Sequence, residues 1–340
     1  MNTARRHTPD VSVVVIGRNE GQRLVRCLQS VARARWQDLA WELIYVDSNS
    51  SDGSVRVAAG FGARVASIGD ARPCAAVARN VGWRMARSPV VLFLDGDTVL
   101  EPDFVARALP HLRDARVAAV WGHRRELDPR QSVYTRVLDL DWVFPTGRTD
   151  YFGGDVLVRR RALEDAGGFD DTLVAGEEPE LCRRLRERGW AIEHVDLPMT
   201  RHDLAITTLR AWWTRAERAG LASAQVAQRF AGTPDPLWTR EARRNRVHGL
   251  ALLALPFAAV ATALWSPPAL ALLAAAVLAL WARSARRCRW KCPDDAGLAW
   301  LYAAHSHLQQ VPILVGQWRW WRLQRAQRAP TLIEYKGSTP

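Results

Sequence analysis

The chain has 340 residues and is poor in lysine and cysteine. Lys291 and Lys336 are its only lysines, so nearly all of its cationic side chains are arginines. Five cysteines, an odd number spread over expected helices and core segments, argue against a disulfide framework. The net charge is +12, yet zinc-finger spacings and RNA-binding signatures are absent. We therefore expect no nucleic-acid partner.

The first ten residues are polar and lack the apolar core of a secretory signal peptide. From this we expect the part of the chain that carries the chemistry to be cytoplasmic. Arginine-rich runs flank apolar segments near the C-terminus, which favours a membrane as the partner of the excess positive charge.

Strand-forming runs alternate with segments of helical periodicity over roughly the first hundred residues. The expected strands are 11–16, 43–46, 63–68 and 90–94, and the expected helices are 24–31, 55–59 and 72–86. Such alternation predicts an α/β fold with a mostly parallel, Rossmann-like sheet. Further on, we expect strands at 117–121, 152–158 and 192–195, helices at 102–112 and 180–188, and a variable loop or helix at 124–150.

Two carboxylates follow the central strand. Five apolar residues, 90–94, lead into Asp95-Gly96-Asp97. Ligands bind at the carboxyl ends of strands in open parallel sheets, and Gly96 allows a sharp turn there. Like charges on Asp95 and Asp97 would repel unless a cation lay between them, which suggests Mg²⁺ or Mn²⁺ holding a phosphate. A plain acidic turn after a core strand is the alternative.

Residues 249–282 contain no charged side chain, and Pro267-Pro268 interrupt them near the middle. Each half has about fourteen to seventeen residues, somewhat short of the ~20 of a spanning helix. Arginines precede and follow the pair, which predicts that both ends lie on the cytoplasmic side. We expect a hairpin that dips into or just crosses the inner membrane; a hairpin buried in a soluble protein is the alternative.

Two further segments are amphipathic. Residues 209–230 carry Trp212 and Trp213 among arginines and alanines, and we favour a membrane-surface helix over a core helix. Residues 298–321 are rich in tryptophan, and Pro312 should kink them. The expected organisation is a catalytic domain (1–204), an amphipathic helical linker (205–247), an apolar hairpin (248–283), and interfacial helices with a tail (284–340).

Five ordered motifs between residues 11 and 203 resemble the family 2 glycosyltransferases, inverting enzymes with the GT-A fold. They are Val13-Val14-Val15-Ile16-Gly17-Arg18-Asn19-Glu20, Asp47 with Ser51-Asp52-Gly53-Ser54, Ala78-Arg79-Asn80-Val81-Gly82, Asp95-Gly96-Asp97, and Gly176-Glu177-Glu178-Pro179-Glu180-Leu181. Both aspartates of the family's last motif are glutamates here. The second motif is a rearranged version of the family's.

The resemblance implies a role for each of these positions. Glu178 would be the catalytic base, with Glu177 as the alternative, and His202 would join Asp97 as a metal ligand. The residues implied to bind the nucleotide sugar are Ile16, Arg18, Asn19, Glu20, Asp47, Arg79, Asp95 and Gly154. Taken singly, these residues also fit ordinary surface charges, an acidic helix start or a glycine turn.

The implied activity is the transfer of a sugar from a nucleotide-diphosphate donor, most simply a UDP-sugar, to a hydroxyl group. The apolar tail points to a lipid or lipid-linked glycan as the acceptor. A catalytically inactive, nucleotide-sugar-binding membrane scaffold is the alternative function, because the base motif has glutamates for aspartates. A sugar nucleotidyltransferase is disfavoured, since residues 18–21 make a poor glycine-rich phosphate loop.

Overall fold

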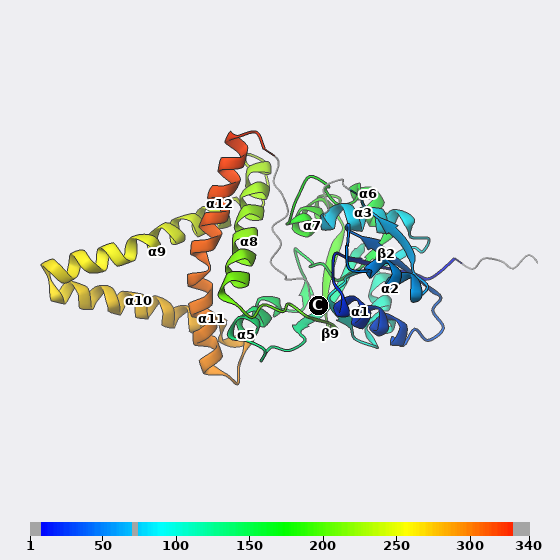
Figure 1. Ribbon diagram of the computed structural model, residues 1–340, viewed down its shortest axis with the longest axis horizontal. Helices are drawn as coiled ribbons and strands as arrows, with labels where there is room; N and C mark the ends of the chain where they lie inside the picture. Colours follow the sequence, from blue (N-terminus) through cyan, green and yellow to red (C-terminus); the bar gives the residue numbers. More distant parts are fainter. Residues whose placement is uncertain (1–7, 70–73, 329–340) are drawn as a thin grey trace, which may run out of the picture. The chain divides into compact units, whose positions relative to one another are not determined.

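The computed structural model describes residues 8–69 and 74–328, which form two compact units (Figure 1). The first unit contains residues 8–69, 74–128 and 144–204. The second contains residues 129–143 and 205–328. The segment 129–143 thus leaves the first unit in the middle of its sequence and packs with the C-terminal helices.

The first unit is built on one sheet, which has nine strands in the described residues and the order β3-β2-β1-β4-β8-β6-β9-β5, with β7 beside β9. Its strands are β1 (Val11–Gly17), β2 (Trp41–Asp47), β3 (Arg64–Ser67), β4 (Val90–Asp95), β5 (Thr98–Leu100), β6 (Val117–Glu126), β7 (Gly147–Arg148), β8 (Val156–Arg159) and β9 (Ala191–His202). Its helices are α1 (Gln22–Arg33), α2 (Ser54–Gly60), α3 (Ala75–Met85), α4 (Phe104–Ala108), α6 (Arg160–Ala166) and α7 (Glu177–Glu187).

The α/β class is confirmed, but the sheet is mixed. Strands β3, β2, β1 and β4 are parallel, as the alternation of the first hundred residues predicted. Strand β8 then runs antiparallel to both β4 and β6, and β5 runs antiparallel to β9. The alternation ends after β4, so nothing after it compels a parallel crossover.

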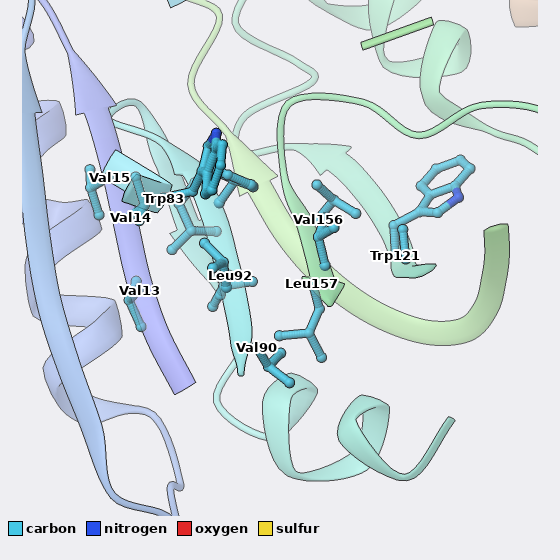
Figure 2. Close-up of a cluster of buried hydrophobic side chains, with 14 of the residues drawn as sticks. Val13, Val14, Val15, Trp83, Val90, Leu92, Trp121, Val156 and Leu157 are labelled. Atoms are coloured by element: carbon cyan, nitrogen blue, oxygen red, sulfur yellow. The ribbon is translucent and has the colours of Figure 1, made fainter. Parts of the chain in front are cut away.

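The core lies on both faces of β1 and β4 (Figure 2). Val13, Val14 and Val15 are fully buried, as expected of a central strand covered on both sides. Helix α3 lies so close to β1 that a Cβ atom on Gly82 would come within 2.2 Å of Val14 Cγ1. The glycine of the Ala78–Gly82 motif is therefore required for this helix–strand contact.

Several element boundaries differ from those expected. Strand β9 was expected to end near Val195 but continues to His202, because irregular register with β6 accommodates Pro198. Strand β8 begins at Val156 rather than near Phe152. Helix α7 begins at Glu177 rather than Glu180, since Pro179 is tolerated in a first helical turn. Residues 124–150, expected to be a variable loop or helix, contain the end of β6, a short helix and β7.

The second unit is helical. Its helices are α5 (Val133–Asp139), α8 (Leu209–Arg229), α9 (Thr239–Trp265), α10 (Pro267–Cys288), α11 (Ala296–Leu308) and α12 (Gln310–Arg325). The apolar face of α8 was expected to lie on a membrane surface. This expectation is wrong, because that face packs on α12 and α9. Trp212, Leu221 and Val226 on that face are buried, so the core-helix alternative applies. Pro312 lies in the first turn of α12, just after the break between α11 and α12.

Helices α9 and α10 form an antiparallel pair that projects from the rest of this unit (Figure 1). Both are long and apolar enough to cross a membrane, judged by length and composition, and only 6% of each apolar window is buried. Phe257, Leu264 and Trp265 are between 78% and 93% exposed. Each helix is longer than the charge-free half that predicted it, because the flanking arginines are also helical.

Helices α8 and α12 cross at glycines, which makes their contact a sensitive point. A Cβ atom on Gly316 would lie 2.0 Å from the carbonyl oxygen of Glu217 and 2.8 Å from the Leu221 nitrogen. Both are backbone atoms that cannot move aside. Gly316→Ala should therefore lower the stability of the second unit by about 1–3 kcal/mol or more, seen as earlier thermal unfolding of the full chain.

Gly297→Ala is the matched control. Its Cβ atom would meet nothing closer than Asp295 Oδ1 at 3.4 Å, an ordinary contact. This variant should unfold at or slightly above the temperature of the parent chain. Equal losses in the two variants would contradict a close α8–α12 crossing.

Candidate active site

The carboxylate turn lies where β1 and β4 end. The nitrogen of Gly96 donates to the carbonyl oxygen of Ile16 at 2.7 Å, which holds the turn against the end of β1. A Cβ atom on Gly96 would lie 3.0 Å from that same oxygen. Hence the apolar strand places Asp95 and Asp97 at the carboxyl edge of the parallel strands, where the sequence predicted them.

Two buried guanidinium groups hold Asp95. Arg79 Nη2 lies 2.9 Å from Asp95 Oδ1, and Arg124 Nη2 lies 3.3 Å from Asp95 Oδ2. Gly154 lies against this pair, because a Cβ atom there would come within 2.4 Å of Asp95 Oδ2 and 2.7 Å of Arg79 Nη2. The absence of a side chain at Gly154 is thus what lets the aspartate and arginine meet.

Arg79 also connects Asp95 to the acidic start of α7. Its Nη1 lies 2.8 Å from Glu177 Oε1 and 3.3 Å from Glu178 Oε1. Three carboxylates far apart in the sequence therefore converge on one arginine. Since Arg79 is 3% exposed and flanked by these carboxylates, their charges raise its pKa against the opposing effect of burial.

The two glutamates differ in their surroundings. Glu177 is 5% exposed and makes the shorter contact with Arg79, whereas the side chain of Glu178 is 18% exposed. Burial and the neighbouring charge of Glu177 raise the pKa of Glu178 to about 7, although Arg79 opposes this shift. Glu178 is therefore a carboxylate with a pKa near neutrality at a partly exposed position.

Asp95, Asp97 and His202 form a group that could hold a metal ion. One ligand atom of each lies within 4.8 Å of those of the other two. His202 Nε2 is 3.1 Å from Asp97 Oδ2. Burial, and then the charge of Arg124, lower the pKa of His202 to about 3, so its imidazole is neutral as a metal ligand must be. Two carboxylates and a neutral imidazole suit a divalent cation such as Mn²⁺.

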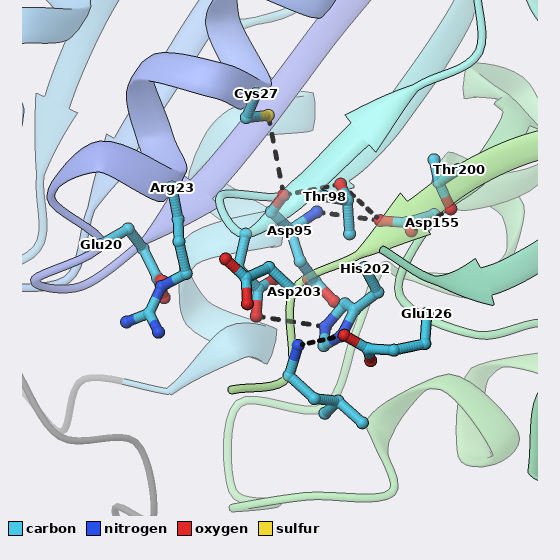
Figure 3. Close-up of polar contacts among 12 residues, drawn as sticks. Glu20, Arg23, Cys27, Asp95, Thr98, Glu126, Asp155, Thr200, His202 and Asp203 are labelled. Carbon is cyan, nitrogen blue, oxygen red and sulfur yellow. Dashed lines mark hydrogen bonds and ion pairs between the residues drawn. The ribbon is translucent and has the colours of Figure 1, made fainter. Parts of the chain in front are cut away.

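Two residues of this cluster were missed from the sequence. Asp155, 3% exposed, accepts from the Asp95 nitrogen at 3.0 Å and from Thr200 Oγ1 at 2.7 Å (Figure 3). Arg124 Nε lies 3.4 Å from Asp155 Oδ2. Asp155 follows the glycine pair 153–154, which was a usable signal. Arg124 had none, because it lies in a segment without clean periodicity.

The other expected nucleotide-binding residues, Ile16, Arg18, Asn19, Glu20 and Asp47, lie at or just after the ends of β1 and β2. The buried carboxylate of Asp47 accepts from the Tyr45 hydroxyl at 3.1 Å and from the Ser50 nitrogen at 2.8 Å. Asn19 has a φ of 52° and donates its backbone N–H to Ser50 Oγ at 2.9 Å.

Arg18 and Glu20 belong to the same turn after β1. Both are partly exposed, and Glu20 pairs with Arg23 at 2.8 Å. The structure thus brings this set together beside the carboxylate turn, and the binding role of its members stays a prediction.

Comparison with known proteins gives a consistent picture. The family model described as "Glycosyl transferase family 2" matches residues 12–165, and the one described as "Glycosyl transferase family group 2" matches residues 90–285, more than half of the chain. Pre-mycofactocin glycosyltransferase of Mycobacterium tuberculosis (strain CDC 1551 / Oshkosh) is 31% identical over 173 residues, which cover 48% of this chain and 37% of that protein. Glycosyltransferase AglE of Haloferax volcanii is 24% identical over 195 residues, covering 54% and 64%. The chain thus spans less than two thirds of either relative.

Solved structures share the fold. The mannosyltransferase PcManGT from Pyrobaculum calidifontis, in complex with GDP-Man and Mn²⁺, matches with a TM-score of 0.62 at 24% identity, over 89% of this chain and 88% of that one. Staphylococcus aureus TarS 1–349 matches with a TM-score of 0.50 at 14% identity, over 91% of each chain. These likenesses confirm the GT-A fold. The two family models show that the chain belongs to the family 2 glycosyltransferases.

Proposed function

We propose that the protein is an inverting glycosyltransferase that moves a sugar from a nucleotide-diphosphate donor to a hydroxyl group. The observation that carries this proposal is that Arg79 joins Glu178 to Asp95, and that ligand atoms of Asp95, Asp97 and His202 lie within 4.8 Å of one another. A candidate base and a candidate metal group thus lie in one site, as direct displacement at an anomeric carbon requires.

The donor's diphosphate is assigned to the metal group. Asp95 already faces two guanidiniums, so Asp97 and His202 are the primary ligands we expect for Mg²⁺ or Mn²⁺. When bound, such a cation would neutralise the charge on the leaving diphosphate. The base and ribose are assigned to the turn after β1, residues 16–20, and to Asp47.

Glu178 is assigned as the base. Its carboxylate would take the proton of the acceptor hydroxyl as that oxygen bonds to the anomeric carbon and the bond from this carbon to the diphosphate breaks. Attack opposite the leaving group inverts the centre in one step. Glu177, held at 2.8 Å by Arg79, is better suited to fixing the arginine and raising the pKa of Glu178.

The pH profile follows from the raised pKa of Glu178. A base acts only when it is deprotonated, so kcat/KM should fall about tenfold per pH unit below about 7 and level off above it. Glu177→Gln removes a like charge and should move this acidic limb to lower pH. Initial rates between pH 5 and 9 measure both profiles. If Glu177→Gln left the acidic limb of the kcat/KM profile at the same pH, the assignment of that limb to Glu178 would be contradicted.

The acceptor is proposed to be a lipid or lipid-linked glycan, and the site of action the cytoplasmic face of the inner membrane. The exposed apolar surfaces of α9 and α10 support this, since a bilayer would cover them. The arginines at both ends of the pair support a hairpin with both ends on the cytoplasmic side.

A donor screen tests the proposed function. Full-length protein is incubated with UDP- and GDP-sugars, with and without Mn²⁺, and release of the nucleoside diphosphate is measured with lipid-linked acceptors present. Metal-dependent release from at least one donor is expected. Donor binding without release under every condition would instead favour the inactive, nucleotide-sugar-binding membrane scaffold.

A further inference from the structure

A second pocket lies in the catalytic unit beside α1 and β5, and the proposed transfer does not use it. Its volume is about 490 Å³, within the usual range of small-ligand sites. Its lining combines three arginines with an apolar floor. The residues are Arg26, Gln29, Ser30, Arg33, Val99, Leu100, Glu101, Pro102, Leu127 and Arg201.

The pocket and the metal group are formed by different residues. None of the residues that line the pocket is Asp95, Asp97 or His202. Successive side chains of a strand point to opposite faces, so Arg201 and its neighbour His202 diverge. His202 contacts Asp97, whereas Arg201 lines the pocket. A ligand here would therefore not occupy the donor's place.

Hydrogen-bond donors in the pocket outnumber the acceptors that satisfy them. Within residues 8–69 and 74–328, Arg33 forms no ion pair and Gln29 no side-chain hydrogen bond. Arg26 binds Asp203 through Nη2, but its Nε is buried without a hydrogen-bond partner in the same part of the chain. Glu101 is already paired with Arg201 at 2.8 Å. Arg33 and Gln29 thus keep hydrogen-bond donors that could bind an anion from solution.

The rest of the lining is apolar. Leu100 is 2% exposed, and Val99, Pro102 and Leu127 continue the same surface. A fully hydrated anion such as free phosphate would leave this floor uncovered. An anion carrying a short stretch of hydrocarbon matches both halves of the lining.

We propose that this pocket binds the phosphate of an anionic lipid. The phosphate would contact Arg33 and Gln29, and the first carbons of the lipid would cover Val99 and Leu127. Bound there, the lipid would hold this edge of the catalytic unit at a membrane surface. It would also reach Arg26, whose partner Asp203 directly follows His202.

The test is a titration of the full-length protein, in an uncharged detergent, with water-soluble dihexanoyl phosphatidate, followed by native mass spectrometry. Dihexanoyl phosphatidylcholine and inorganic phosphate are titrated in parallel. One phosphatidate should bind, and Arg33→Glu should weaken its binding at least about tenfold, as expected for the loss of a charge-assisted contact. Arg33→Gln should give an intermediate loss.

Arg107→Glu is the matched control, because Arg107 is also an exposed arginine in the last turn of a helix but does not line the pocket. It should leave phosphatidate binding unchanged. Equal binding of inorganic phosphate would overturn the lipid assignment, and phosphatidate binding indifferent to Arg33→Glu would overturn the site. Donor turnover by the Arg33 variants, expected to be normal without added lipid, shows separately whether the proposed transfer stands.

Discussion

Glu178→Gln is expected to lower turnover by about 10²- to 10⁴-fold, the usual contribution of a general base. Glutamine keeps the size of the side chain but cannot take a proton from the acceptor hydroxyl. Donor binding should change little, since the expected donor contacts lie on Asp97, His202 and the turn after β1. Single-turnover rates and donor titration separate the two effects.

Glu187→Gln controls for changes to the helix itself. Glu187 lies at the other end of α7, is 46% exposed and pairs with Arg183. Glu187 is outside the group of carboxylates that contact Arg79, so turnover should stay within about twofold of the parent chain. Near-normal turnover in Glu178→Gln, combined with a large loss in Glu177→Gln, would move the base to Glu177.

Asp97→Asn is expected to weaken metal-dependent donor binding by about 10²-fold or more. Asparagine removes one full negative charge from a group 2% exposed, where charge interactions are strong. Removal of metal by a chelator should give the parent chain the same low affinity, and Mn²⁺ should restore the parent but not the variant. Isothermal titration with the donor, with and without Mn²⁺, measures both.

Asp103→Asn is a suitable control, because Asp103 is an exposed carboxylate outside the metal group. It forms an ion pair with Arg35 at 3.0 Å. It should bind donor and Mn²⁺ as the parent does. If Asp97→Asn kept its full response to Mn²⁺, Asp97 would not be a ligand.

Local patterns were enough to predict the first half of the sheet and the position of the carboxylate turn. Strands β1, β2 and β4 are short runs of buried aliphatic residues, and the intervening helices have clear periodicity. Strand β8 and the extension of β9 were harder to predict from local patterns. Their pairing depends on strands that are distant in the sequence, and Pro198 is allowed only because β6 is irregular beside it.

The helical unit shows the same limit. The composition of α8 fits both a membrane surface and a helix interface, because tryptophan and alanine occur in each. Only the approach of α12, at Gly220 and Gly316, decides that its apolar face is buried. By contrast, the apolar pair α9–α10 was evident from the absence of charge alone.

By itself, the sequence determined the α/β class, the family and the residues that end the central strands, because these depend on the order and spacing of neighbouring residues. Only the tertiary structure decided which charges meet. Arg79 joins Asp95 to both glutamates, and Arg124 and Asp155 complete the cluster. Such contacts arise when separate strands and helices pack together, and burial then sets the pKa values that distinguish one carboxylate from its neighbour.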